Sequence, residues 1–222
     1  VLSLLKTYTL RWNYGHFDRS IQNIIHNDHH NMNHDIENNF LLKKNHIYNI
    51  GKGNLSDMGG IYLLGRQHGT IVSENRIHDV NCENYGAWGI YLDEGSSFMT
   101  VEKNLVYACG SQSFNVHYGE GNIIRNNIAA LSREGLMSPG IDKGETHATA
   151  IYYNNIFLTY NKAPIYIEML NSSHFYDNGN LMWSLTEGDE LYFNTSENIY
   201  TLKMAQEKGF IHFPTVSDPL FK

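Results

Sequence analysis

Residues 60 to 105 read GIYLLGRQHGTIVSENRIHDVNCENYGAWGIYLDEGSSFMTVEKNL, and they contain the same two motifs twice. The first motif, Gly60-Ile-Tyr-Leu63, returns 29 positions later as Gly89-Ile-Tyr-Leu92. The second is an alternating apolar run that ends in Asn-x-apolar, and it occurs at 72–77 and again at 101–105. Short alternating runs predict β-strands, and the Gly and Asn residues between them predict sharp turns. Strands that return in phase at this spacing predict a repeat architecture.

The second motif continues along most of the chain. Ser113-Phe-Asn-Val116 takes the place of the first motif in the next unit, and a looser copy of the second motif lies at 21–25. Such a unit cannot bury its apolar face alone, so units must stack and bury a continuous column of Ile, Leu and Val. We expect the asparagines that mark the second motif to form side-chain ladders between coils. These markers are Asn45, Asn75, Asn104, Asn126, Asn154 and Asn180.

These repeats predict an all-β fold, a right-handed parallel β-helix of the pectate-lyase type. We expect one domain over 1–222, with stacked coils over about 1–185 and a capping segment over about 186–222. The cap should include a short helix from Ser196 to Gly209. The main competing fold is a β-propeller, whose blades need about 40 residues. Because the repeats start almost at once, we expect the chain to be part of a longer protein with earlier coils.

Composition and charge exclude several classes of function. A net charge of −7 argues against a nucleic acid partner, and no apolar run approaches the ~18 residues of a membrane-spanning helix. Two cysteines without a Cys-x-x-Cys motif make a structural zinc site improbable. A His-rich group with two aspartates occupies 26–35, but Asn/His-rich turns explain it more simply than a metal. We therefore expect neither a metal nor a cofactor.

Candidate site residues follow the second copy of the first motif. If Ile90 and Leu92 point inward, Tyr91 and Asp93 point outward. Counted from the asparagine markers, the position of Asp93 is held by Leu64 one coil earlier and by His117 one coil later. Asp93 and His117 should then be neighbours about 5 Å apart, as strands in adjacent coils are. A carboxylate beside an imidazole is a common acid/base or orienting pair. A solvated Asp at a strand end is the simpler alternative.

A second carboxylate, Asp57, precedes the first copy of the motif. Glycoside hydrolysis needs two carboxylates, one as acid and one as nucleophile or base. When the two coils are aligned, Asp57 lies about seven positions before the position that Asp93 occupies. In a straight strand this offset corresponds to a separation of over 20 Å. They can pair only if the segment 56–59 folds back across the strand face. An Asx turn or a cap before the strand explains Asp57 equally well.

Further polar and aromatic residues lie on the same coils. Aromatic side chains can stack on sugar rings, although they can also fill gaps in a stacked core. Arg66 and His68 could bind hydroxyl or carboxylate groups, and Glu94 follows Asp93 directly. The aromatic candidates are Tyr62, Tyr85, Trp88, Tyr91 and Tyr118.

The segments 55–62, 64–70 and 88–97 resemble the right-handed β-helix glycoside hydrolases of family 141, which include α-L-fucosidase and xylanase activities. The resemblance covers about residues 40 to 222 and continues through 115–119, 122–127 and 218–221. It implies Asp57 and Asp93 as the catalytic aspartates. Family members are much longer, with earlier coils and an inserted β-rich domain, which implies that this chain is only a C-terminal part.

The sequence thus predicts a glycoside hydrolase that cleaves a plant or host oligo- or polysaccharide by a two-carboxylate mechanism. A non-catalytic glycan-binding β-helix, as in a tailspike or adhesin, is the first alternative. A polysaccharide lyase is the second, although it would need a Lys or Arg base beside calcium-binding aspartates. An extracellular or periplasmic location is expected from the class of substrate.

Overall fold

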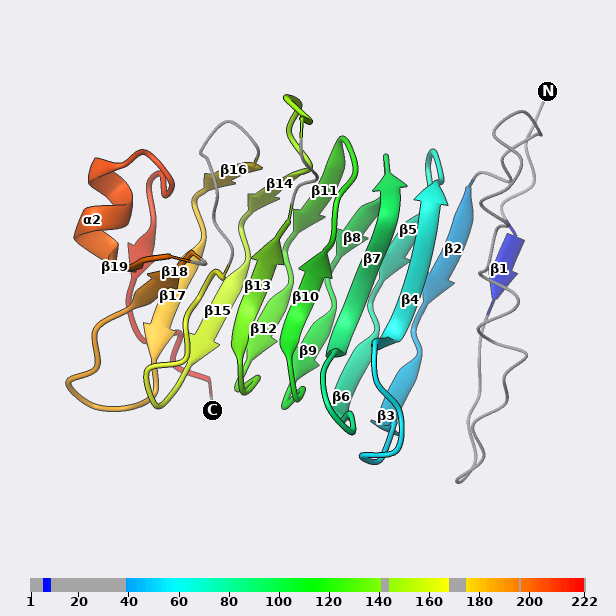
Figure 1. Cartoon of the computed structure of the whole chain (residues 1–222), viewed down its shortest axis with the longest axis horizontal. Helices are drawn as coiled ribbons and strands as arrows, with labels where there is room; N and C mark the ends of the chain where they lie inside the picture. The colour runs from blue at the N-terminus through cyan, green and yellow to red at the C-terminus, as the bar shows by residue number, and fades with distance from the viewer. Residues whose placement is uncertain (1–5, 9–38, 141–143, 168–174, 196, 222) are drawn as a thin grey trace.

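A computed structural model describes residues 6–8, 39–140, 144–167, 175–195 and 197–221. Successive coils lie side by side along the long axis of the molecule, and their strands form parallel sheets (Figure 1). The predicted class is confirmed, because the chain is a nearly all-β parallel solenoid of about five turns. Sheets that run continuously from coil to coil exclude the propeller. The looser repeat at 21–25 and the His-rich group at 26–35 lie outside the described residues.

Each full coil adds one strand to each of three sheets. The first sheet has the order β1-β2-β5-β8-β11-β14-β16. Its strands are β1 (Lys6–Tyr8), β2 (Phe40–Lys43), β5 (Ile71–Ser73), β8 (Thr100–Glu102), β11 (Asn122–Arg125), β14 (Ala150–Tyr153) and β16 (Phe175–Asn178). The second sheet has the order β20-β17-β15-β12-β9-β6-β3. Its strands are β3 (His46–Ile50), β6 (Arg76–Val80), β9 (Leu105–Tyr107), β12 (Ile128–Ala130), β15 (Ile156–Thr159), β17 (Leu181–Ser184) and β20 (Thr215–Val216).

The third sheet carries the first sequence motif and has the order β13-β10-β7-β4. Its strands are β4 (Met58–Arg66), β7 (Ala87–Ser97), β10 (Gln112–Val116) and β13 (Gly135–Pro139). The predicted phase is confirmed: Ile61 pairs with Ile90, which pairs with Phe114. The repeated glycine of the motif has a steric reason, because a Cβ on Gly89 would overlap Val106 and lie 2.5 Å from the carbonyl oxygen of Ser113.

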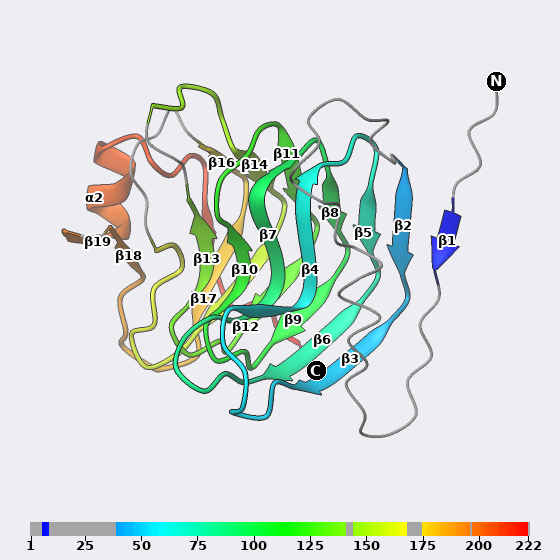
Figure 2. The ribbon, with the colours of Figure 1, turned by 45° about the vertical axis from the view of Figure 1, so that its right-hand side comes forward.

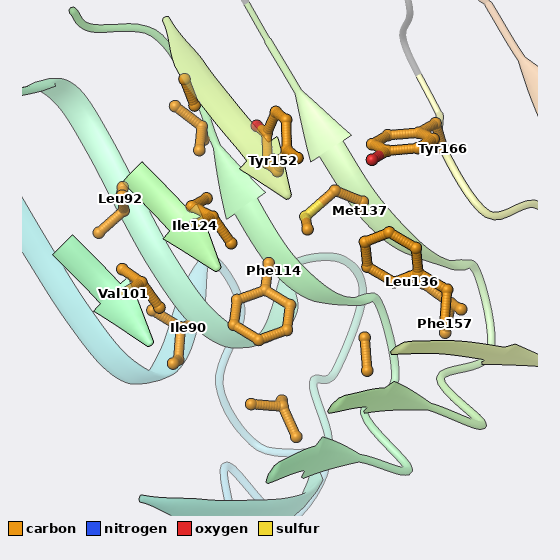
Figure 3. Close-up of a cluster of buried hydrophobic side chains, with 14 of the residues drawn as sticks. Ile90, Leu92, Val101, Phe114, Ile124, Leu136, Met137, Tyr152, Phe157 and Tyr166 are labelled. Atoms are coloured by element: carbon orange, nitrogen blue, oxygen red, sulfur yellow. The ribbon is translucent and has the colours of Figure 1, made fainter. Parts of the chain in front are cut away.

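The three sheets enclose a continuous apolar core (Figures 2 and 3). Ile90 and Leu92 are each 1% exposed and point inward beside Phe114. The predicted alternation in β7 is therefore correct. Each inward residue packs on its counterpart in the next coil, which explains why the motif repeats Ile and Leu at the same positions.

The asparagine ladder exists, but two of its predicted members are wrong. The ladder runs through Asn127 and Asn155, and not through Asn126 and Asn154, and its amide-to-amide hydrogen bonds are 2.9–3.0 Å long. Asn126 and Asn154 instead adopt φ 55°. They occupy the turn position that Lys44, Glu74, Lys103 and Gly179 hold in other coils, all with positive φ. The first Asn of each Asn-Asn pair thus takes the left-handed turn, which Asn tolerates, and the second enters the ladder.

The end of the chain follows the last coil. The predicted helix at 196–209 is shorter than expected: α2 spans Leu202–Glu207, and the hydroxyl of Thr201 caps it by accepting from the backbone N–H of Met204. An antiparallel pair, β18 (Tyr192–Asn194) and β19 (Ile199–Thr201), precedes the helix. Afterwards β20 joins the second sheet beside β17. Within the described residues, no helix is long and apolar enough to cross a membrane.

Candidate functional site

The site is centred on Asp93, which lies in β7 on the outer face of the third sheet. Leu64 of β4 is its register partner, and Leu92 pairs with Val116, so that His117 follows beside Asp93. The carboxylate Oδ1 of Asp93 lies 2.8 Å from Nδ1 of His117. The predicted neighbour relation is confirmed, because coils of unequal length are nevertheless held in phase by the ladder and the core.

Both oxygens of the Asp93 carboxylate are hydrogen-bonded. The Tyr62 hydroxyl donates to Oδ2, and the Tyr91 hydroxyl donates to Oδ1 at 2.8 Å. With His117 and these two phenols around it, Asp93 is only 5% exposed. The residue therefore points outward from the core, as expected, but it is covered by its neighbours rather than solvated.

These contacts keep Asp93 ionised. Burial by itself would raise the pKa of the carboxyl group. Hydrogen bonds from Tyr62, Tyr91, His117 and the backbone of Glu94 outweigh burial and hold the pKa below its usual value of 3.8. The same environment acts oppositely on the phenols: burial, followed by the hydrogen bond to Asp93, raises the pKa of Tyr62 and of Tyr91 well above the ordinary value. At neutral pH the site is thus a carboxylate held by two protonated phenols.

His117 is the most accessible of the groups that contact Asp93, with 55% of its side chain exposed. An ionised carboxylate can only accept, so Nδ1 of the imidazole carries the proton in this contact. The ring packs edge-on against Tyr118, with centroids 4.9 Å apart. Nε2 has no hydrogen-bond partner within the described residues. An imidazole anchored at one nitrogen and exposed at the other can exchange a proton with a bound molecule.

Asp57 lies immediately before β4 and is exposed. Its backbone N–H donates to the carbonyl oxygen of Tyr85 at 3.0 Å, with φ at 55°. The fold-back of segment 56–59 that a close contact between Asp57 and Asp93 would require is not observed, because Met58 and Gly59 belong to β4 and pair with Ala87 and Trp88. The structure therefore gives no support for a direct pairing of the two carboxylates, and the role of Asp57 as a second catalytic aspartate rests on the resemblance alone.

The negative charge of Asp57 nevertheless acts on the same phenols as Asp93. It contributes to the raised pKa of Tyr62 and Tyr91. It is also the main cause of the raised pKa of Tyr85, before burial and a hydrogen bond between these two side chains. The charges of Asp57 and Asp93 thus act in the same direction on the pKa of Tyr62 and Tyr91.

Aromatic side chains pack beside Asp93 on the outer face of the third sheet. The Trp88 ring lies 4.2 Å from the Tyr91 ring, which meets Tyr62 edge-on at 4.9 Å. The Trp88 indole N–H donates to the side-chain oxygen of Gln112 at 2.7 Å. Gln112 was missed from the sequence, yet it stands in phase with Trp88, two positions before the pair Phe114 and Ile90. Extending the alignment of Ser113-Phe-Asn-Val116 with Gly89-Ile-Tyr-Leu92 by one residue toward the N-terminus would have placed Gln112 beside Trp88.

Arg66 and His68 make their contacts in a different cluster. The Arg66 guanidinium lies 4.8 Å from the centroid of the Phe98 ring, and His68 stacks on the same ring at 4.2 Å. Arg66 also pairs with Glu120 at 3.3 Å. Arg66 and His68 thus belong to a surface cluster around Phe98, and none of these contacts involves Asp93. Glu94, in contrast, is exposed next to Asp93, and its backbone supports that carboxylate.

The fold and the site define a parallel β-solenoid that carries a buried carboxylate, an exposed imidazole and aromatic rings on one outer face. Comparison of the chain with family models, curated proteins and solved structures finds no match. The resemblance to family 141 therefore stays a prediction. In the part of the chain that is described, no three His, Cys, Asp or Glu side chains gather in a way that would hold a metal ion.

Proposed function

We propose that this chain carries the site of a glycoside hydrolase that acts on an oligo- or polysaccharide. The observation that carries the proposal is the environment of Asp93, an ionised carboxylate bonded to Tyr62, Tyr91 and His117. Such a carboxylate can stabilise the positive charge that develops on a sugar ring when the glycosidic bond breaks. The aromatic rings beside it offer apolar faces on which a sugar could stack.

The surroundings of Asp93 indicate which catalytic role this carboxylate could take. A general acid must hold a proton at the working pH, so a carboxyl group with a lowered pKa is poorly suited to that role. Asp93 is therefore the nucleophile or the electrostatic stabiliser in this proposal. The proton for the leaving glycosidic oxygen comes from Asp57, the second aspartate of the resemblance, or from Nε2 of His117. In either case Tyr62 and Tyr91 position Asp93 and do not transfer protons, because their raised pKa values keep them protonated.

The test is turnover of aryl fucosides and of xylan by Asp93→Asn, Asp57→Asn and His117→Gln proteins, made in this chain and in a longer parent chain. We expect Asp93→Asn to lower kcat by at least about a hundredfold, the usual loss when a group that stabilises charge in the transition state is removed. The control is Glu187→Gln, at an exposed carboxylate outside the candidate site, and it should retain activity. Unchanged turnover in the Asp57 and Asp93 variants would end the enzymatic assignment.

A glycan-binding solenoid without catalysis is the second candidate. The 5% exposure of Asp93 favours it, because a covered carboxylate can organise a binding surface without meeting the substrate. Tyr85, which is 57% exposed, would then contribute a stacking surface at the edge of the site. Retention of an oligosaccharide without turnover, weakened by Tyr85→Ala, would support this candidate. A lyase would instead release an unsaturated, ultraviolet-absorbing product.

An extracellular or periplasmic location and the missing N-terminal coils of a parent protein belong to the same proposal. Both follow from the class of substrate and from the resemblance. Detection of the intact parent in a secreted or periplasmic fraction tests both.

A further inference from the structure

Asn115 lies in the middle of β10, with its side chain on the outer face of the third sheet. Its neighbours in the strand, Phe114 and Val116, both belong to the buried core. Because side chains alternate along a strand, the side chain of Asn115 between them points outward. Its register partner in the preceding coil is Tyr91. His117, the imidazole of the candidate site, follows two positions further along the chain.

The side-chain amide of Asn115 is almost completely buried, yet it has no partner in the protein. The residue is 7% exposed, and within the described part of the chain its side chain makes no hydrogen bond. Its amide atoms are nevertheless not among the unpartnered side-chain atoms that are cut off from solvent, so they open onto the outer face. An amide buried without a hydrogen bond destabilises a fold, and Asn is also unfavourable inside a strand.

The other buried asparagines of the described chain all have structural partners. Each of them uses its amide to bond the backbone or an asparagine of a neighbouring coil. They are Asn45, Asn75, Asn104, Asn122, Asn127, Asn155 and Asn180. Asn115 is the exception, and it lies beside the candidate site. The fold gains nothing from its amide, so we look for its partner in a bound molecule.

We propose that Asn115 binds a hydroxyl group of an uncharged sugar ring and thereby sets the specificity of the candidate site; this inference rests on the proposed function. An amide offers two N–H donors and a carbonyl acceptor, which suits a hydroxyl group because a hydroxyl both donates and accepts. A strand rises about 3.3 Å per residue, so Asn115 and His117 stand about 7 Å apart along β10. A sugar whose glycosidic oxygen meets Nε2 of His117 can therefore reach Asn115 with a ring hydroxyl.

The charges of the third sheet favour an uncharged sugar over a uronic acid. The carboxylates of Asp93 and Glu94 lie next to each other in β7, and Glu94 is exposed. The four strands of the sheet contain a single Lys or Arg, which is Arg66, and it pairs with Glu120. A uronic acid would thus bring a further carboxylate beside Asp93 without a free cation on these strands to pair with it.

The experiment is a double-mutant cycle between Asn115 and the hydroxyl groups of the sugar, read as affinity in NMR titrations of the full chain. The probes are methyl α-L-fucoside, methyl β-D-xyloside and their monodeoxy derivatives. Wild type should bind the derivative that lacks the contacted hydroxyl about tenfold more weakly, because the amide is then left unpaired. Asn115→Val should bind the intact sugar about tenfold more weakly and lose nothing further with that derivative. A structural role would instead weaken the binding of every derivative equally.

The same variant tests whether the amide has a partner in the protein. Val suits a strand and no hydrogen bond is lost, so Asn115→Val should leave the unfolding temperature unchanged or raise it. Asn178→Val is the matched control, because Asn178 is an exposed asparagine in β16 of the first sheet, and sugar binding should be unchanged. A marked fall in the unfolding temperature of Asn115→Val would show a structural role and overturn the proposal.

A matched pair of sugars tests the preference for an uncharged ring. Methyl β-D-glucuronide is methyl β-D-xyloside with a carboxylate added on C5, and it should bind at least about tenfold more weakly because of the charge on Asp93. Tighter binding of the glucuronide overturns the proposal. So does failure of the fucoside and the xyloside to bind.

Turnover measured in parallel separates this inference from the proposed function. Hydrolysis of aryl fucosides or xylan without coupling at Asn115 keeps the hydrolase and overturns the role of Asn115. Coupled binding without hydrolysis supports the contact between Asn115 and the sugar and ends the enzymatic assignment.

Discussion

The imidazole of His117 lies 2.8 Å from the carboxylate of Asp93, although 24 residues separate them in the sequence. The contact exists because Val116 and Leu92 are paired between β10 and β7, which sets the next residue of each strand side by side. Solenoid register therefore builds a hydrogen-bonded group from residues that belong to different coils. The predictions below test the contacts that this register creates.

Asp93→Asn should destabilise the chain by about 1–3 kcal/mol at pH 7, because it weakens a charged acceptor shared by three side chains. The lowered pKa of Asp93 means that its contribution is present above pH ~4 and is lost as pH falls through the pKa of the folded state. The difference from wild type should accordingly shrink toward pH 3. Urea unfolding at pH 7 and pH 3 measures it, with Glu94→Gln as the control. A difference that grows on acidification contradicts the assignment.

Asp177 should show the opposite dependence on pH. This inward-facing residue is 1% exposed, and burial raises the pKa of its carboxyl group from 3.8 to about 6. The folded state thus binds the proton more tightly, and stability falls as pH rises from about 4 to 6. A shift of roughly two units costs about 3 kcal/mol at neutral pH. Asp177→Asn should therefore stabilise the chain by about 1–3 kcal/mol at pH 7.5 and have much less effect at pH 4.

Denaturant midpoints at the two pH values check the Asp177 prediction, and Glu187→Gln, at an exposed position, is the control. Asn at 177 can still accept from the Tyr166 hydroxyl, which now donates to Asp177 at 2.5 Å. Equal stabilisation at both pH values would show that ionisation of Asp177 is not the cause.

The Asn126-Asn127 pair offers a matched test of the ladder. The side chain of Asn127 donates to Val101 and Asn155 and accepts from Asn104, so Asn127→Ala should cost about 3 kcal/mol through buried groups left unpaired. Asn126 is exposed with φ 55°, and Asn126→Gly should change stability by less than about 0.5 kcal/mol. Thermal unfolding compares the two variants. Equal losses would mean that the ladder is misassigned.

The two cysteines should differ sharply in reactivity. Both are free thiols; Cys109 is buried and Cys82 is partly exposed. Burial raises the pKa of the Cys109 thiol to about 12, and the thiolate is the reactive form. A maleimide at pH 7.5 should therefore label one thiol in the native chain and two after denaturation. Mass spectrometry should place the native label on Cys82, and rapid native labelling of Cys109 would contradict its burial.

The sequence predicted much of this fold. The repeated Gly-Ile-Tyr-Leu motif predicted the phase of β4 and β7, and with it the neighbour relation of Asp93 to His117. The asparagine markers predicted a ladder between coils. These inferences succeeded because a solenoid repeats one local solution, so that equal positions in the repeat are neighbours in space.

Other features depended on backbone geometry that residue types do not encode. In Asn126-Asn127 and Asn154-Asn155 either residue could have entered the ladder, and only the left-handed turn at the first decided which one did. Helix α2 begins later than predicted because residues 199–201 pair with β18 as a strand. Segment 56–59 likewise does not fold over the sheet, because Met58 and Gly59 already pair with β7 as part of β4.

The sequence by itself determined the architecture, the register of the coils and the residues that face the core. It did so because apolar alternation and steric demands at glycine recur in every coil. Only the tertiary structure decided that Asp93 is covered by two tyrosines, that Arg66 is bound to Glu120, and that His46 faces His78. The repeat sets which outer-face residues lie in neighbouring positions, but it does not set their rotamers, so their hydrogen-bond partners follow from the twist and spacing of the folded coils.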